Sequence, residues 1–445
     1  MLGTIIETHI KNNIMLKNLF LSLLLLPLLA LSQHTISGTF KPASDFKMAI
    51  LYKVLPTEMS YINHANVDSL GQFVIPVKKE MENGLYKIVY ASPQEEYNFE
   101  VFYTNQDVEL TFSLDKGVNF LKSTDNKLWQ SYTKSMKMIS DAIAKFYANP
   151  IANPSDLLKL THLQAQTQEQ FETATNASFV NQFIKANKTY YPSVFEEETT
   201  YKNHIKSHYF DALDFGNINL LNSDVLVSKA LSYVFTYVDF ENANASYIEN
   251  INTLVSKVKN QEAFKNLILE LIWTEFSKEN EIVANYITDT YLLDIAKAEN
   301  NTELIAQLLL LKSTSIGAKA PDFNINTSTT LHSLDAKTNY LVVFWSSTCG
   351  HCLKELPELH KLIDTNIKVI AIGLEDEPKF WKETIKQFPK FTHVYGKEKW
   401  ENKLGNAYNV QSTPNYYLLD KNKKIIAKPY DVLAVKKLLV KQASN

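Results

Sequence analysis

The two cysteines of the chain, Cys349 and Cys352, constrain its fold more than any other feature. They form a C-x-x-C motif directly after an apolar run from Tyr340 to Trp345, which predicts a buried strand. Apolar residues follow at helical spacing from Leu353 to Ile363, which predicts a helix. The motif therefore marks a turn from strand to helix, with Cys349 at the N-terminus of the helix.

This position favours redox chemistry. A helix N-terminus presents unpaired N–H groups and a partial positive charge, and both stabilise a thiolate, which is the reactive form of cysteine. The helical i, i+3 relation brings the second sulfur close enough to form a short disulfide. The pair predicts a two-electron switch in which Cys349 is the nucleophile and Cys352 the resolving thiol.

The cysteine count limits the alternatives. With no further cysteine in the chain, a framework of structural disulfides is excluded. A zinc site needs four ligands, so His351 and either His360 or His393 would have to join the cysteine pair. We expect no metal and no cofactor other than the Cys349–Cys352 disulfide itself.

Around the cysteines the sequence resembles thioredoxin and, more closely, the TlpA/ResA-like thiol–disulfide oxidoreductases of bacterial envelopes. The matching features are Phe344–Trp345, the C-G-H-C motif, Glu355, Pro357, the lead-in segment 317–323 and Thr413–Pro414. The resemblance implies that residues 313–445 form an α/β thioredoxin-like fold with a mixed sheet. Segment 375–396 matches the extra helix and strand of this branch.

The resemblance also implies roles for individual residues. In this family the proline matching Pro414 is cis and packs against the active site, so Thr413 and Pro414 are expected to pair with the substrate backbone. Thioredoxin has a buried Asp on the strand before the motif, where this chain has Val343. Glu355 matches the acid of the TlpA/ResA branch, which implies that it relays the proton of Cys352. The alternative is an ordinary surface glutamate.

Three neighbouring residues have supporting roles. His351 either stabilises the thiolate of Cys349, which would make the disulfide more oxidising, or is a solvent-facing spacer. Trp345 is expected to support packing and Pro357 to bend the helix.

The first 32 residues predict a cleaved secretory signal. A short basic start at Met15 to Asn18 precedes an apolar core from Leu19 to Leu29, and Ala30 to Ser32 has the small-x-small pattern of a cleavage site. The mature chain would begin near Gln33. We therefore expect the periplasm or the cell envelope, where disulfide chemistry also belongs.

Two regions separate this signal from the redox domain. Residues 33–122 alternate in the manner of strands and predict an antiparallel β domain with Tyr and Phe in its core, similar to the β-rich domains that precede thioredoxin-like modules in secreted bacterial proteins. Residues 123–312 are helical, beginning with an apolar stripe of residues three or four apart. That stripe contains Leu128, Tyr132, Met136, Ile139, Ile143 and Phe146.

The sequence thus predicts a multidomain, exported thiol–disulfide oxidoreductase that exchanges its disulfide with protein dithiols. We expect it to act as a reductase, supplied with electrons by a membrane partner. A net charge of −3 gives no indication of nucleic-acid binding, and every one of the 45 basic residues is Lys.

Two other functions remain open. The first is a non-enzymatic binding or scaffold protein of the envelope with a vestigial redox domain. The second is a peroxiredoxin-type peroxidase, a class that activates its cysteine with an Arg. This chain has no Arg, and Ser346 stands where that class has Thr.

Overall fold

A computed structural model describes residues 34–78, 80–149, 153–363 and 367–443. The chain divides into two compact units, one containing residues up to 237 together with 256–261, and the other residues 238–255 and 262 onward. The signal peptide expected at residues 1–32 lies outside the described residues, and the domain limits at 122/123 and 312/313 stay predictions. In the described ranges no helix is long and apolar enough to cross a membrane.

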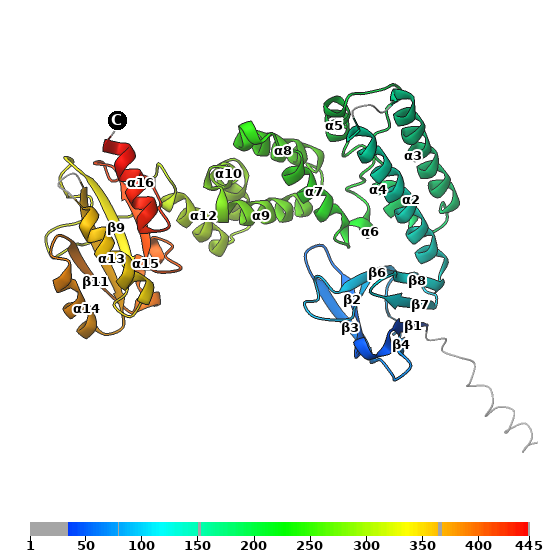
Figure 1. The fold of residues 1–445 in the computed structure, drawn as a ribbon, viewed down its shortest axis with the longest axis horizontal. Coiled ribbons are helices and arrows are strands. Elements are labelled where there is room, and N and C mark those ends of the chain that lie inside the picture. Colours follow the sequence, from blue (N-terminus) through cyan, green and yellow to red (C-terminus); the bar gives the residue numbers. More distant parts are fainter. Residues whose placement is uncertain (1–33, 79, 150–152, 364–366, 444–445) are drawn as a thin grey trace, which may run out of the picture. The chain divides into compact units, whose positions relative to one another are not determined.

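The first unit begins with two four-stranded sheets, ordered β4-β1-β7-β8 and β3-β2-β5-β6 (Figure 1). The strands are β1 (Thr35–Lys41), β2 (Met48–Val54), β3 (Met59–Asn66), β4 (Gln72–Pro76), β5 (Gly84–Val89), β6 (Asn98–Tyr103), β7 (Val108–Ser113) and β8 (Gly117–Lys122). Neighbouring strands are antiparallel except β1 and β7, which are parallel. The expected antiparallel β domain is therefore present, with one parallel pair.

The core of these sheets contains Phe and Tyr residues, as the sequence predicts, together with aliphatic residues. Ile36, Gly38 and Phe40 alternate inward along β1, and the ring of Phe40 lies 4.7 Å from that of Phe73 and 4.8 Å from that of Phe46. Gly38 permits this packing, because a Cβ there would lie 2.8 Å from the Phe73 ring. The residues of β3 and β8 show no regular alternation between buried and exposed positions.

Helices follow the sheets. They are α2 (Thr124–Tyr147), α3 (Pro154–Ala174), α4 (Asn181–Ala186), α5 (Glu198–Ser207), α6 (Ile218–Leu221), α7 (Val225–Thr236), α8 (Ala243–Lys257), α9 (Glu262–Glu279), α10 (Glu281–Ile287), α11 (Leu293–Ala298) and α12 (Thr302–Thr314). Figure 1 shows α2 and α3 side by side. The predicted stripe on α2 is confirmed in part, since Tyr132, Ile139 and Ile143 are buried. Asn126 joins α2 to β6, because its side chain exchanges hydrogen bonds of 2.8 and 2.7 Å with the backbone of Phe102.

The C-terminal part of the second unit is a five-stranded mixed sheet ordered β11-β10-β9-β12-β13. Its elements are β9 (Asn339–Trp345), α13 (Gly350–Leu362), β10 (Ile367–Glu375), α14 (Pro378–Thr384), β11 (Thr392–Lys397), α15 (Lys403–Ala407), β12 (Asn415–Leu419), β13 (Ile425–Ala427) and α16 (Val432–Ala443). Strands β9, β10 and β11 are parallel, whereas β12 and β13 are antiparallel to their neighbours. The predicted mixed sheet is confirmed.

Strand β9 lies at the centre of this sheet because its residues are apolar on both faces, a pattern typical of buried parallel strands. Leu341, Val343 and Trp345 pack on one face against α13 and α16. Tyr340, Val342 and Phe344 pack on the other face, against α15 and the lead-in segment. The C-terminal end of β9 therefore delivers the chain directly to the cysteine motif.

Residues 317–320, in the lead-in segment, continue this sheet. The Gly317 N–H donates to the carbonyl of Ile425 (2.7 Å), the Ile425 N–H to that of Ala318 (2.8 Å), and the Ala320 N–H to that of Lys423 (2.9 Å). Gly317 has a φ of +91°, which glycine adopts without strain. The segment 317–320 thus lies along β13, at the edge of the sheet.

Candidate active site

The two cysteines are joined by a disulfide at the start of α13, with Cα atoms 5.3 Å apart. Cys349 is the N-cap residue, and its sulfur accepts the backbone N–H of Cys352 at 3.1 Å. Cys349 is partly exposed, whereas Cys352 is fully buried. The predicted turn from strand to helix is confirmed, and the exposed sulfur is the one nearest to the helix N-terminus.

Glu355 lies one helical turn after Cys352 and is 7% exposed, so it is not a surface glutamate. Its Oε2 accepts the hydroxyl of Tyr416 at 2.7 Å and the backbone N–H of Val432 at 3.0 Å. Burial and the hydrogen bond to Glu355 raise the pKa of Tyr416, so this hydroxyl remains a donor. The sequence did not indicate Tyr416, because its contact with α13 depends on how β12 and the helix pack.

His351 extends into solvent but its ring reaches back along the helix. The Nε2 atom lies 2.8 Å from Oε1 of Glu355, and the two side chains are 65% and 9% exposed. The residue therefore contacts the buried acid from a largely exposed position. Its two expected roles, thiolate stabiliser and solvent-facing spacer, stay predictions.

Thr413 and Pro414 lie beside the disulfide. The Thr413–Pro414 peptide bond is cis, as expected, and the sulfur of Cys349 lies 3.4 Å from the carbonyl oxygen of Thr413. The structure thus brings together Cys349 and Thr413, which are 64 residues apart in the sequence. The pairing of β9 with β12 joins the two segments.

The two supporting residues lie in the packing around the motif. Trp345 is fully buried and belongs to the same apolar cluster as Cys352 and Leu356. Pro357 lies within α13.

Sequence analysis missed one acid of this site, Glu375. It is the last residue of β10, is 2% exposed, and accepts hydrogen bonds from the backbone N–H of Ser347 and the hydroxyl of Ser346. These serines form the turn that leads into Cys349. Because β9 and β10 are parallel, their carboxyl ends meet at one edge, and an acid ending an otherwise apolar strand is the signal that could have revealed it.

Within the described part of the chain, no group of three or more His, Cys, Asp or Glu residues is placed to hold a metal ion. The site brings together the Cys349–Cys352 disulfide and two buried carboxylates, Glu355 on the same helix and Glu375 beneath the turn that leads into Cys349.

One family of known proteins matches the C-terminal part of the chain. Residues 338–425 match a family described as thioredoxin-like. None of the curated proteins matches the chain. Among solved structures, the chain is similar to a thioredoxin-like protein from Bacteroides caccae, with 19% identity, a TM-score of 0.37, and coverage of 56% of this chain and 95% of that one.

Two further solved structures cover the C-terminal part. One is the thioredoxin domain of a thiol-disulfide oxidoreductase from Bacteroides vulgatus (24% identity, TM-score 0.25, 29% of this chain and 97% of that one). The other is a domain of a possible thiol-disulfide isomerase from Cytophaga hutchinsonii (30% identity, TM-score 0.26, 29% of this chain and 94% of that one). The family match and the disulfide at the start of α13 together assign the C-terminal part of this chain to the thioredoxin-like family, as a thiol–disulfide oxidoreductase domain.

Proposed function

We propose that the chain is an exported thiol–disulfide oxidoreductase that reduces disulfides in protein substrates through Cys349 and Cys352. The observation that carries this proposal is the unequal exposure of the two sulfurs. Cys349 is partly exposed at the N-terminus of α13, whereas Cys352 is fully buried. A bulky substrate disulfide can therefore approach only Cys349.

Reduction begins with attack by the Cys349 thiolate on one sulfur of a substrate disulfide. A mixed disulfide forms between Cys349 and that sulfur, and the other substrate sulfur leaves as a thiolate that takes up a proton. Cys352 then gives its proton to Glu355 and attacks the sulfur of Cys349, which breaks the mixed disulfide. The second substrate sulfur leaves as a thiolate and takes up a proton from solvent, and Glu355 returns its proton to solvent. The substrate leaves with two thiols, having gained two electrons, and the Cys349–Cys352 disulfide has formed.

Substrate positioning is assigned to Thr413 and Pro414. The carbonyl of Thr413 lies beside the sulfur of Cys349 at 3.4 Å. An extended substrate backbone that pairs with this segment would bring its own sulfur to Cys349. A membrane-bound dithiol donor would then return two electrons to the oxidised pair, which keeps the chain working as a reductase.

Trapping of the mixed disulfide tests the order of attack. The Cys352→Ser variant lacks the resolving thiol, so it should accumulate covalent complexes with substrate proteins that a reductant releases. The Cys349→Ser variant should accumulate none. The opposite pattern would refute the assignment of Cys349 as the nucleophile.

An assay of catalytic turnover distinguishes the proposed enzyme from the alternative, a scaffold protein with a vestigial redox domain. The full chain should catalyse reduction of insulin by dithiothreitol. A Cys349→Ser variant that matches the wild-type rate would contradict the proposed enzyme.

A further inference from the structure

His351 contacts the carboxylate of Glu355 from an exposed position. Its Nε2 atom lies 2.8 Å from Oε1 of Glu355, and the two side chains are 65% and 9% exposed. They are four residues apart on α13, so they lie on the same face of the helix. The imidazole can therefore exchange protons with solvent while the carboxylate beside it stays buried.

The other oxygen of this carboxylate has two donors of fixed charge. Oε2 of Glu355 accepts the hydroxyl of Tyr416 at 2.7 Å and the backbone N–H of Val432 at 3.0 Å. A backbone N–H has no charge to change. Burial and the hydrogen bond to Glu355 raise the pKa of Tyr416, so its hydroxyl stays a neutral donor. Of these three contacts, the one made by His351 at Oε1 is therefore the contact whose charge can change in weakly acidic solution.

The charged groups around Glu355 act in opposite senses. Asp431, whose side chain accepts the N–H of Ala434 at the start of α16 (2.7 Å), is close enough to Tyr416 to contribute to the rise in its pKa. A negative charge on this side disfavours the ionised form of Glu355, whereas a protonated His351 in contact with Oε1 favours it. Histidine carries its positive charge in weakly acidic solution, where a carboxylate begins to take up a proton. The contact thus opposes protonation of Glu355 in the pH range where protonation begins.

We propose that His351 is a positioning residue that keeps Glu355 ionised and so extends the resolving step of the redox reaction to lower pH. This inference rests on the proposed function, in which Glu355 takes the proton of Cys352. Only the ionised carboxylate can accept that proton. As Cys352 bonds to Cys349, the bond from Cys349 to the substrate sulfur breaks, and the substrate sulfur leaves with its electron pair. His351 acts through Oε1 of Glu355 and takes no part in the bonds that change.

Stopped-flow absorbance measures both steps of the reaction when the reduced full-length chain is mixed with an equimolar chromogenic disulfide, dithiobis(nitrobenzoate). Attack by Cys349 releases one coloured thiolate, and attack by Cys352 on the mixed disulfide releases the second. His351→Ala, a change at an exposed position, should move the acid limb of the second step to higher pH by about half to one pH unit. On this limb the rate of the second step should fall about three- to tenfold. The pH profile of the first step should not change.

Three further variants test whether the effect depends on the contact with Glu355. His351→Lys keeps a positive charge four residues before Glu355, so it should restore the acid limb at least in part. Glu355→Gln has no carboxylate to ionise, so adding His351→Ala to it should not change the second step any further. Lys354→Ala is the matched control, because it removes a positive charge from an exposed position of the same helix. It should leave the acid limb in place.

The same acid limb in the wild type and in His351→Ala would overturn the inference. A shift of the first step alone would also overturn it, because His351 would then stabilise the thiolate of Cys349. An equal shift in Lys354→Ala would overturn it as well, because any nearby positive charge would then suffice. These three outcomes leave the proposed function standing. If the wild type releases no second coloured thiolate, Cys352 does not resolve the mixed disulfide, and both the proposed function and this inference are wrong.

Discussion

His351 and Glu355 are in contact, one helical turn apart, although one side chain is in solvent and the other is buried. Nε2 of His351 lies 2.8 Å from Oε1 of Glu355. Tyr416 and the backbone N–H of Val432 occupy the other carboxylate oxygen. The exposed imidazole of the C-G-H-C motif is thus directed toward the acid beneath the motif.

The reduction potential of the Cys349–Cys352 pair tests whether His351 acts on Glu355 or directly on the thiolate. We expect the Cys349–Cys352 pair to titrate against glutathione between the thioredoxin value of about −270 mV and the strong-oxidant value of about −120 mV. Because His351 contacts Glu355, His351→Ala should stay within about 30 mV of the wild type, equivalent to about 1.4 kcal/mol. A larger shift to more negative values would mean that His351 stabilises the thiolate directly. A wild-type value near that of the strong oxidant would overturn the reductase direction.

Replacing Glu355 with Gln should slow the resolving step. The amide keeps the shape of the side chain but cannot accept the proton of Cys352, and general-base catalysis typically contributes about 10²–10⁴-fold. Rapid-quench kinetics should show a mixed disulfide that persists at least about tenfold longer. Glu358→Gln, at an exposed residue of the same helix paired with Lys361, is the control. Equal lifetimes in the two variants would remove Glu355 from the mechanism.

Tyr416→Phe should destabilise the C-terminal domain by about 1.5–3 kcal/mol, because it removes a hydrogen bond to a buried carboxylate. Hydrogen–deuterium exchange of peptides from β9 and β12 in urea measures this domain alone. Tyr430→Phe, at a residue that is 80% exposed, should have little effect.

Tyr416→Phe should also change how the free energy of unfolding depends on pH above pH 10. Burial raises the pKa of Tyr416 above its ordinary value of 10.0. The contribution of the protonated Tyr416 hydroxyl to the free energy of unfolding is therefore complete below pH 10. It is lost as the pH rises from there toward the folded-state pKa. Wild-type stability should fall more steeply above pH 10 than that of Tyr416→Phe, and parallel curves would contradict this.

Glu375→Ala should loosen the turn before Cys349. It leaves the buried N–H of Ser347 without its acceptor, at a cost of about 1–3 kcal/mol. We expect a lower kcat/KM for insulin and a less stable domain. Glu377→Ala, two residues later and exposed, is the matched control. Unchanged kinetics in Glu375→Ala would mean that the turn holds its shape without the acid.

The mature chain should begin near Gln33 after export. N-terminal sequencing of the protein recovered from the envelope of an expressing bacterium is the measurement. An intact Met1 or Met15 on that material would contradict the predicted signal peptide.

The redox site was predictable where its residues are neighbours in sequence. The apolar run before Cys349 and the helical spacing after Cys352 specify a strand and a helix locally, so the position of the sulfurs followed. Tyr416 and Glu375 were not predictable in this way, because they approach the motif only through strand pairing and helix packing. Their side chains carry no periodic signal.

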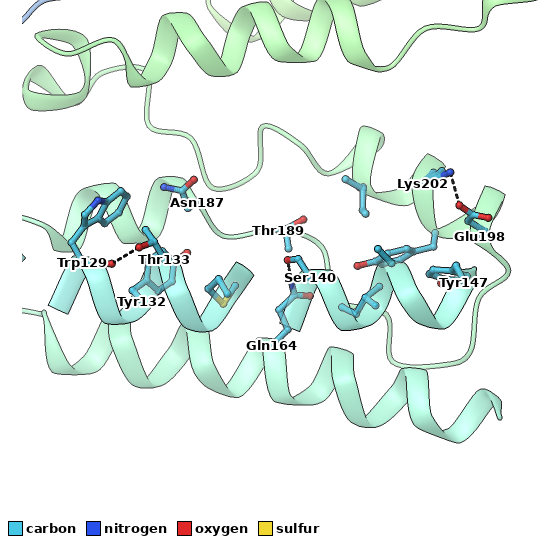
Figure 2. Close-up of a pocket in the computed structure, with 15 residues that line it drawn as sticks. Trp129, Tyr132, Thr133, Ser140, Tyr147, Gln164, Asn187, Thr189, Glu198 and Lys202 are labelled. Atoms are coloured by element: carbon cyan, nitrogen blue, oxygen red, sulfur yellow. Dashed lines mark hydrogen bonds and ion pairs between the residues drawn. The ribbon is translucent and has the colours of Figure 1, made fainter. Parts of the chain in front are cut away.

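The same distinction applies to the first unit. Ile36, Gly38 and Phe40 alternate with polar residues along β1, so the sequence pattern is sufficient to indicate this strand. The residues of β3 show no such alternation, so the pattern does not indicate it. The hydrogen bond from Gln164 to Ser140 could not be predicted either, because it forms only where α3 packs on α2 (Figure 2).

The pairing of residues 317–320 with β13 bears on how this domain should be isolated. The family match begins at residue 338, which makes that position a tempting start for a fragment. In such a fragment the backbone N–H and C=O groups of Ile425 would lose their hydrogen bonds to residues 317 and 318. The strand edge would then be exposed, and an exposed strand edge can pair with another chain and cause aggregation. A fragment that starts before Gly317 keeps this edge covered, so recombinant yield and solubility should depend on some twenty residues that contain no part of the active site.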